Sequence, residues 1–177
     1  MTSPEKDRVD GPEEHPGANP GEERSTLMKV GELMTGTNLI TARPGTPVLE
    51  ARQTMLKAKI RHLLVTEDDG LLVGIVTDRD IRLNLPSQAT SLSVWEINHL
   101  LTKLTVGEVM TRAVITVGPD REARDAAVLM LDHTIGALPV MDGGRLAGIV
   151  TEADILRGFV WLTGGPTAAR PEARRRG

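Results

Sequence analysis

Two copies of one short segment carry the side chains of this sequence that are best placed for chemistry. Residues 74–80 read Gly-Ile-Val-Thr-Asp-Arg-Asp, and residues 148–154 read Gly-Ile-Val-Thr-Glu-Ala-Asp. The apolar run predicts a strand, and Thr77 and Thr151 stand where an N-cap residue would begin a helix. The aspartate that ends each segment then falls on the first helical turn.

The Thr-x-x-Asp pattern has a structural interpretation and a chemical one, and both stay open at this point. It is a relative of the capping box, in which a threonine N-cap stabilises a helix by about 1 kcal/mol. The same geometry offers free N–H groups that attract a phosphate, a hydroxyl that can donate to it, and a carboxylate that can accept from both ribose hydroxyls. Gly74 and Gly148 would allow close approach of a backbone or a ligand.

An internal repeat positions the two segments. Residues 30–35, Val-Gly-Glu-Leu-Met-Thr, recur at 106–111 as Val-Gly-Glu-Val-Met-Thr. Ile40-Thr41 recurs as Ile115-Thr116, and the offset between the copies drifts only from 76 to 74 residues. A repeat of this length indicates two similar units that pack together.

Each copy is expected to have the order β-α-β-β-α. A strand surrounds Ile40 or Ile115, and a helix follows, with Pro47 in its first turn in copy 1 and Asp120 as its N-cap in copy 2. Helical spacing puts one apolar face on each helix: Val48, Ala51, Met55 and Leu56 in copy 1, and Ala123, Ala126, Ala127, Met130 and Leu131 in copy 2.

Two apolar runs joined by turn residues then predict a β-hairpin in each copy. The runs are 62–66 and 71–76 in copy 1, and 137–141 and 146–150 in copy 2. A second helix should start at Asp78 or at Glu152.

The chain therefore divides into five parts. They are a disordered N-terminal tail (1–28), repeat 1 (29–85), a connector (86–105), repeat 2 (106–162) and a disordered basic C-terminal tail (163–177). In the connector, Ser93 and Glu96 have capping-box spacing, and the predicted helix carries an apolar stripe made of Val94, Ile97, Leu100, Leu101 and Leu104.

Composition excludes several classes of protein. The chain has no cysteine, so it has no disulfide, thiolate metal site or cysteine nucleophile, which fits the cytoplasm. No apolar run approaches the ~20 residues that span a membrane. The net charge of −3 is not that of a duplex-DNA binder. The histidines do not repeat, and no catalytic motif occurs, so neither a metal site nor an enzyme is expected.

The repeated segments identify a family. The Val-Gly-Glu-x-Met-Thr opening, the β-α-β-β-α order, Leu-Pro-Val at 138–140 and the Gly-Ile-Val-Thr-x-x-Asp close resemble the CBS domain family, over about residues 28–162. Two such repeats form a CBS pair, or Bateman module. The resemblance implies an α+β fold in which the repeats are related by a pseudo-twofold axis, with two clefts for adenosyl ligands such as AMP, ADP, ATP or S-adenosylmethionine.

The resemblance also implies site residues. Asp80 and Asp154 would hold ribose, and Thr77 and Thr151 would reach phosphate. The adenine would be framed by Asn38, Leu39, Ile40, Arg61, His62, Leu63, Ala113, Val114, Ile115, Gly136, Ala137 and Leu138. Such modules pair into discs, so the resemblance implies a homodimer. No catalytic cofactor is implied.

The two clefts should differ. Many family members have a small hydroxyl or amide residue before the aspartate, where this chain has Arg79 and Ala153. With Arg79 and Arg61 grouped beside the repeat-1 motif, we expect that cleft to bind a phosphorylated ligand more tightly. The repeat-2 cleft, with Glu152 at its helix start, would prefer a ligand of less negative charge or stay empty. If Arg79 instead points into the opposite cleft, this order reverses.

Three functions remain in competition. The first is a sensor of adenine nucleotide or S-adenosylmethionine that regulates an unidentified partner protein and uses neither membrane nor nucleic acid. The second is a dimerisation scaffold whose clefts bind nothing. The third, less favoured, is a nucleic-acid binder that uses the arginine-rich residues 170–177.

Overall fold

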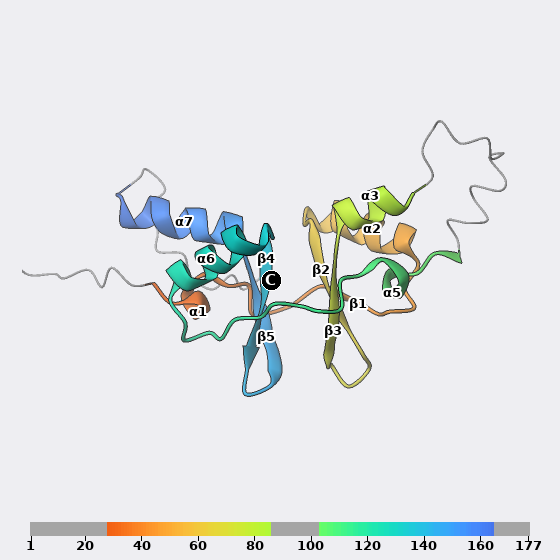
Figure 1. The fold of residues 1–177 in the computed structure, drawn as a ribbon, viewed down its shortest axis with the longest axis horizontal. Helices are drawn as coiled ribbons and strands as arrows, with labels where there is room; N and C mark the ends of the chain where they lie inside the picture. Colours follow the sequence, from red (N-terminus) through yellow and green to blue (C-terminus); the bar gives the residue numbers. More distant parts are fainter. Residues whose placement is uncertain (1–27, 86–102, 165–177) are drawn as a thin grey trace, which may run out of the picture.

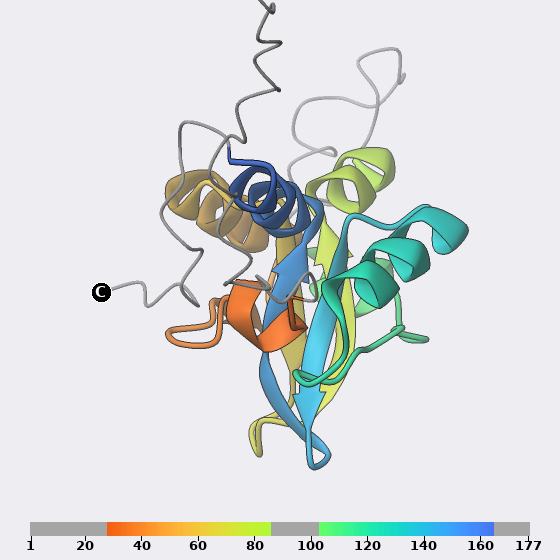
Figure 2. The same ribbon diagram turned by 90° about the vertical axis from the view of Figure 1, so that its left-hand side faces the viewer.

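Two β-hairpins lie side by side at the middle of the molecule, and the helices that pack on them gather at one end (Figure 1). The protein is described from a computed structural model, over residues 28–85 and 103–164. The first hairpin is β2 (His62–Thr66) and β3 (Leu72–Thr77), and the second is β4 (Ala137–Asp142) and β5 (Arg145–Thr151). The hairpin turns project from the end opposite to the helices, as Figure 2 also shows.

Each hairpin has two longer helices. The helices α2 (Val48–Ala58) and α3 (Asp78–Asn84) pack on the first hairpin. The helices α6 (Ala123–His133) and α7 (Glu152–Leu162) pack on the second. The α+β class, both hairpins and the helix starts at Asp78 and Glu152 are confirmed.

A short first strand was expected in each repeat, and in the part of the chain that the structure describes only repeat 1 has one. In repeat 1 it is β1 (Thr41–Ala42), which pairs in parallel with β2 at Leu64 and Val65. In repeat 2 the strand predicted around Ile115 is absent from the described residues, and only a single bridge joins Val117 to Val140. The prediction of a first strand around Ile115 is therefore wrong, whereas the two strands of the second hairpin are present.

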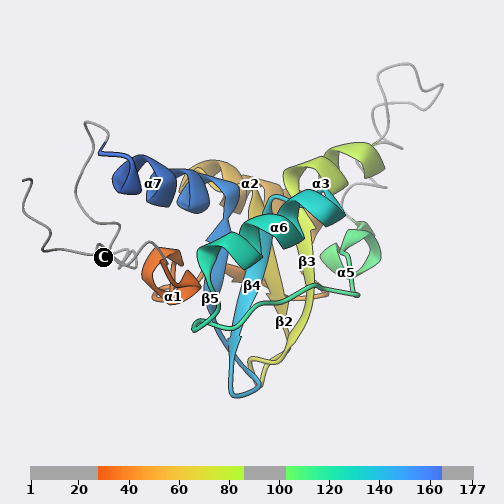
Figure 3. The ribbon, with the colours of Figure 1, turned by 60° about the vertical axis from the view of Figure 1, so that its left-hand side comes forward.

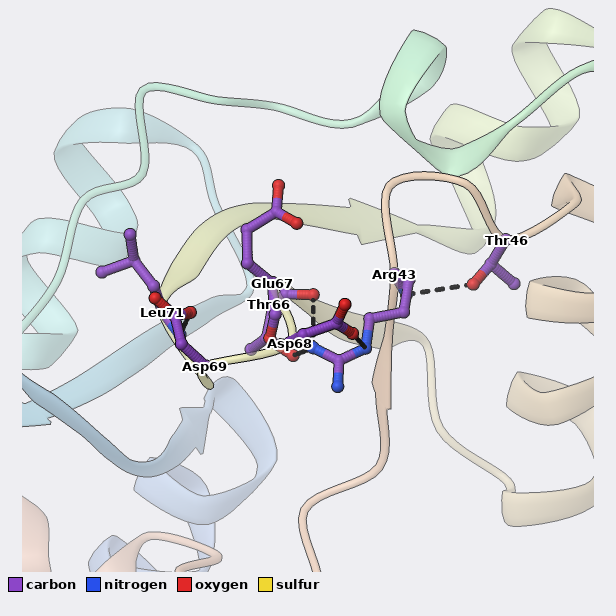
Figure 4. A network of polar contacts seen from close by, with 7 residues as sticks. All are labelled: Arg43, Thr46, Thr66, Glu67, Asp68, Asp69 and Leu71. Carbon is purple, nitrogen blue, oxygen red and sulfur yellow. Dashed lines mark hydrogen bonds and ion pairs between the residues drawn. The ribbon is translucent and has the colours of Figure 1, made fainter.

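Arg43, which directly follows β1, ties this strand to the hairpin turn (Figure 4). Its Nη1 donates to the carbonyl oxygen of Thr66 at 2.9 Å and also to the carbonyl oxygen of Glu67. Its Nε lies 3.5 Å from a carboxylate oxygen of Asp68. The aligned residue of repeat 2 is Gly118, which has no side chain to make such contacts. This difference accounts for the longer pairing of β1.

Two other predictions about the long helices need correction. Asp120 is not the N-cap of α6, which is Glu122; Asp120 precedes the helix and pairs with Lys29 at 3.3 Å. Leu56 and Leu131 do not face the core, because they are 65% and 79% exposed. The 3.6-residue period tells which residues share one face of the helix. It does not tell how much of that face the neighbouring strands bury.

The opening segments of the two repeats are exchanged. The short helix α1 (Val30–Leu33), from repeat 1, packs on repeat 2, and α5 (Val106–Val109), from repeat 2, packs on repeat 1. Figure 3 shows α1 beside β5 and α5 beside β3. Gly31 N donates to the carbonyl oxygen of Pro119 at 2.8 Å, and Gly107 N donates to that of Pro44 at 2.7 Å. Neither short helix was predicted.

The exchange brings two backbones into close contact. Thr35 and Ile149 exchange backbone hydrogen bonds of 2.9 and 3.0 Å, and Ile75 and Thr111 do the same at 3.0 and 2.9 Å. A Cβ on Gly148 would lie 2.6 Å from the carbonyl oxygen of Thr35. The predicted close approach at this glycine is therefore that of backbone.

Each aliphatic core consequently contains residues from both repeats. The first core combines side chains of α2, β2 and β3 with Val106 and Met110, and Leu104 packs against it. The second combines side chains of α6, β4 and β5 with Met28, Val30 and Leu33. The rest of the connector helix predicted from Ser93 lies outside the described residues, as do most of the two tails. Among the described helices, none is long and apolar enough to cross a membrane.

The contacts of Arg43 predict an unequal pair of mutants. Arg43→Met removes charge-assisted hydrogen bonds to two carbonyl oxygens, of which the one to Thr66 is partly buried, and should lower the free energy of unfolding by about 1–2 kcal/mol. Asp68→Asn removes only the partner whose side chain is fully exposed, at 101%, and should change it by less than about 0.5 kcal/mol. Urea unfolding of both variants tests this. Equal losses would show that the ion pair, and not the carbonyl contacts, stabilises the turn.

Candidate functional site

A cavity of about 360 Å³ opens between the two repeats, close to the N-terminus of α7. Four parts of the chain form it: residues 35–40, residues 59–64, Gly136 before β4, and residues 149–157 around the start of α7. Its lining consists of Thr35, Asn38, Leu39, Ile40, Lys59, Ile60, Arg61, His62, Leu64, Gly136, Ile149, Thr151, Glu152, Ala153, Asp154 and Arg157. We call it the Asp154 cavity. Both repeats contribute to it, because the exchange brings Thr35 beside Ile149.

Asp154 is the most constrained polar group of this cavity. Asp154 as a whole residue is only 7% exposed. Its Oδ2 accepts from the backbone N of Thr151 at 3.0 Å and from Thr151 Oγ1 at 2.6 Å. Its Oδ1 accepts from Nη1 of Arg157 at 2.6 Å. These donors hold the carboxylate in one orientation, with one oxygen used by the helix cap and the other by a cation.

Asp80 repeats half of this arrangement. Its Oδ2 accepts from the backbone N of Thr77 at 2.9 Å and from Thr77 Oγ1 at 2.7 Å. Thr77 Oγ1 also accepts from the backbone N of Asp80 at 3.1 Å. The counterpart of Arg157 is Leu83, which is 72% exposed. The second oxygen of Asp80 therefore lacks the cation that Asp154 has at this position.

The hydroxyls of Thr77 and Thr151 already use their protons within the protein. Each donates to the aspartate three residues later, so the capping interpretation of the Thr-x-x-Asp pattern is confirmed in both repeats. A hydroxyl has one proton to donate. A phosphate in the cavity would therefore need other donors, and the nearby cations are the side chains that can supply them.

Three cations line the Asp154 cavity: Lys59, Arg61 and Arg157. The sequence interpretation grouped Arg61 with Arg79 beside Thr77. Arg61 does lie beside this motif, since its carbonyl oxygen accepts from Asp78 N at 3.1 Å, but the two cations do not line the same cavity. Arg61 lines the cavity that holds Thr151, whereas Arg79 is exposed and is not among its lining residues. Arg61 directly precedes β2, whose first residue, His62, pairs with Thr77 in its own repeat and also lines the cavity with Thr151 of the other.

His62 lies at the wall of the cavity, beside Glu152. A Cβ on Gly136 would lie 3.4 Å both from His62 Nε2 and from Glu152 Oε2, so the two side chains meet at this glycine. Burial lowers the pKa of His62 below its ordinary value of 6.5, and Arg61 adds to this effect. Glu152 and Asp80 oppose it, but burial is the largest cause. The imidazole is therefore neutral at pH 7.

The structure gathers only part of the predicted site. The predicted residues that line the Asp154 cavity are Asn38, Leu39, Ile40, Arg61, His62, Gly136, Thr151 and Asp154. The side chains of Leu63 and Leu138 are fully buried in the two cores. The remaining predicted residues are related to the first group by the pseudo-twofold axis, and their role as a second cleft stays a prediction: Thr77, Arg79, Asp80, Ala113, Val114, Ile115 and Ala137.

Sequence reasoning missed two cations of the cavity. Lys59 ends α2 in a left-handed conformation, with φ of 54°, which turns the chain toward the cavity. Arg157 follows Asp154 by three residues on α7 and so shares its helix face. The i, i+3 spacing of Asp154 and Arg157 was the available signal. Within the described parts of the chain, no three histidine, aspartate or glutamate side chains converge to hold a metal ion.

Comparisons with known proteins show the family of this chain. The CBS domain family matches residues 30–87 and 106–160. The chain is 34% identical over 148 residues to the chloroplastic CBS domain-containing protein CBSX2 of Arabidopsis thaliana, which covers 72% of this chain and 62% of the relative. It is 35% identical over 130 residues to the uncharacterized protein MJ1225 of Methanocaldococcus jannaschii, covering 69% of this chain and 44% of the relative. The chain thus spans less than two thirds of these relatives.

Solved structures of similar proteins contain adenosyl compounds. CBSX2 in complex with AMP has a TM-score of 0.62 and 31% identity, over 76% of this chain and 98% of that chain. The CBS domain pair of protein MJ0100, in complex with 5′-methylthioadenosine and S-adenosyl-L-methionine, has a TM-score of 0.61 and 32% identity, over 75% of this chain and 96% of that chain.

The buried imidazole predicts a pH dependence of stability. Because the pKa of His62 is lower in the folded protein than in the unfolded chain, its contribution is fully present above pH 6.5 and is lost as the pH falls through the folded value. The difference in free energy of unfolding between the wild type and His62→Gln should therefore shrink from pH 8 toward pH 5. Parallel stability curves for the two proteins would contradict the buried, neutral imidazole.

Proposed function

The chain belongs to the CBS domain family, and from this premise we propose that it is a regulatory module that binds an adenosyl ligand in the Asp154 cavity. The carrying observation is the buried carboxylate of Asp154, which both its helix cap and Arg157 hold in place at a cavity shared by the repeats. A volume of about 360 Å³ lies within the usual range for small-molecule sites, about 300–1,000 Å³.

The lining divides into parts that suit the parts of such a ligand. Leu39, Ile40 and Ile60 give the cavity an aliphatic wall against which a planar base can pack. Asp154 supplies a charged acceptor for ribose hydroxyls, the kind of hydrogen bond that is strongest. The relatives support this assignment because CBSX2 was solved with AMP and the MJ0100 pair with two adenosyl compounds.

Regulation of a partner protein completes the proposal. The described residues hold a binding cavity, and ligand contacts that join both repeats can change how the repeats sit against each other. A ligand that prefers one arrangement shifts the population toward it. A partner that binds the same arrangement would then respond to the ligand.

Substitution of the two aspartates tests the ligand site. Asp154→Asn keeps an oxygen for the helix cap but removes the charge, and it should weaken AMP binding by about 2 kcal/mol, or about 30-fold. Asp80→Asn makes the same change to the cap of α3, and Asp80 is not among the residues that line the cavity; the proposal therefore expects a smaller loss of AMP affinity from it. Isothermal titration of AMP, adenosine and S-adenosylmethionine measures the effect.

Two results would contradict this proposal. If no adenosyl compound binds the wild type, the module is a scaffold. If Asp80→Asn weakens AMP binding and Asp154→Asn does not, the ligand does not sit in the Asp154 cavity.

Exposed apolar residues on the helices favour a second function, the pairing of two copies. Leu56 of α2 and Leu131 of α6 occupy equivalent positions in the two repeats, and both are exposed. On α7, Leu156 and Phe159 are 63% and 60% exposed. The helices α2, α6 and α7 thus carry exposed apolar residues, those of α2 and α6 at equivalent positions of the two repeats. Such a surface suits contact with the same surface of a second copy across a twofold axis. We propose that the module is a homodimer joined through these helices.

A pair of leucine substitutions tests the dimer. Leu131→Asp places a charge on the helix layer and should convert the dimer to a monomer in sedimentation equilibrium, with at least a tenfold weaker association, about 1.4 kcal/mol. Leu71→Asp is the control, because Leu71 is 55% exposed but precedes β3 at the hairpin turn. A monomeric wild type, or equal effects of both substitutions, would exclude pairing through the helices.

A further inference from the structure

We propose that Arg157 makes the Asp154 cavity selective for phosphorylated adenine nucleotides over adenosine and S-adenosylmethionine. This inference rests on the proposed function of the same cavity and names the class of ligand. Its starting point is that Asp154 and Arg157 are already paired in the structure, through a 2.6 Å contact between Oδ1 and Nη1.

The pair is unequally buried. The side chain of Asp154 is 8% exposed, whereas that of Arg157 is 45% exposed. The aspartate cannot turn away, because Thr151 holds its other oxygen. The guanidinium stands at the end of a long side chain and can move. Any exchange of partners at this site is therefore a movement of Arg157.

A ribose that bonds to Oδ1 of Asp154 competes with Arg157 for the same oxygen. Adenosine must either leave the guanidinium in place and lose that hydrogen bond, or displace it without offering it a new anionic partner. S-adenosylmethionine offers a carboxylate, but this group stands beside an ammonium and beyond a sulfonium, so the ligand as a whole is a cation. A nucleotide offers both partners at once: its hydroxyls bond to the carboxylate, and its phosphate receives the displaced guanidinium. The planar fork of arginine suits a phosphate, and the charge stays whatever the pH.

The other charges of the cavity favour the same ligand. Lys59 and Arg61 line it together with Arg157, and the acidic residues of the lining are Glu152 and Asp154. When the ribose hydroxyls occupy Asp154, the three cations face only Glu152. A phosphate then reduces the repulsion among them, whereas S-adenosylmethionine, with a sulfonium and an ammonium against one carboxylate, adds a net positive charge.

Repeat 1 has no equivalent of the Asp154–Arg157 pair. Its counterpart of Arg157 is Leu83, and the neighbouring Arg82 pairs instead with Asp78, with Nε 2.8 Å from Oδ2. The selectivity is therefore a property of the Asp154 cavity and not of the repeated Thr-x-x-Asp pattern. It reverses the order expected from the sequence, which gave the phosphorylated ligand to the repeat-1 motif.

The affinities of AMP, adenosine and S-adenosylmethionine for the full chain and three variants test the inference. The wild type should bind AMP at least tenfold more tightly than either other compound. Arg157→Gln should weaken AMP about tenfold, the size of one charge-assisted hydrogen bond, but should leave adenosine binding equal or stronger, because Oδ1 of Asp154 is released. Arg157→Lys keeps the charge but not the planar guanidinium, and its AMP affinity should lie between those of the wild type and Arg157→Gln. Arg145→Gln removes an exposed cation of β5 and should change nothing.

The outcomes separate the two proposals. If Arg157→Gln weakens AMP and adenosine by the same factor, Arg157 only orients Asp154 and the inference is wrong, while the proposed ligand site stands. The same holds if the wild type binds the three compounds equally. If thermal unfolding shows that Arg157→Gln is not folded, the ratio of AMP to adenosine affinity in Arg157→Lys decides, and an unchanged ratio overturns the inference. If none of the compounds binds the wild type, both proposals fall.

Discussion

The close contact between the opening segment of one repeat and the hairpin of the other is the constraint on which the remaining structure depends. Gly148 lies so near to Thr35 that a Cβ would stand 2.6 Å from its carbonyl oxygen, and Gly74 meets Met110 and Thr111 in the same way. Neither core is complete without this exchange, because Val30 and Leu33 fill one and Val106 fills the other. The two repeats therefore fold as one unit, and a cavity lined from both sides follows from it.

Because the exchange fixes the distance between the repeats, one residue pair can serve stability and binding together. The threonine and the aspartate of the repeated motif form a helix cap in both copies. The cap uses one carboxylate oxygen and orients the other. In repeat 2 that other oxygen lies at the cavity and meets Arg157. The capping interpretation and the ligand interpretation thus describe different atoms of the same side chain, and accepting one does not weaken the other.

The sequence was sufficient for those features that depend on local order. The hairpins, the helix starts after Thr77 and Thr151, and the existence of two similar units all follow from period, turn residues and repetition. It was insufficient for features that depend on how the copies meet. The exchange of α1 and α5 and the place of Arg61 are set by contacts between residues far apart in the chain, such as Gly31 with Pro119 or Thr35 with Ile149. No local pattern carries that information.

Within one chain, the differences between the repeats are nevertheless a signal of specialisation. Positions that hold the exchange together are the same in both copies, as with Gly31 and Gly107 or the threonines at 35 and 111, because each must make the same backbone contact twice. Residues that line the cavity without making these backbone contacts need not be the same in both copies. Arg61, His62 and Arg157 align with a glycine, an alanine and a leucine. A duplicated fold needs two equal scaffolds but not two equal sites, so the unequal polar positions of the repeat point to the cavity that has acquired its own chemistry.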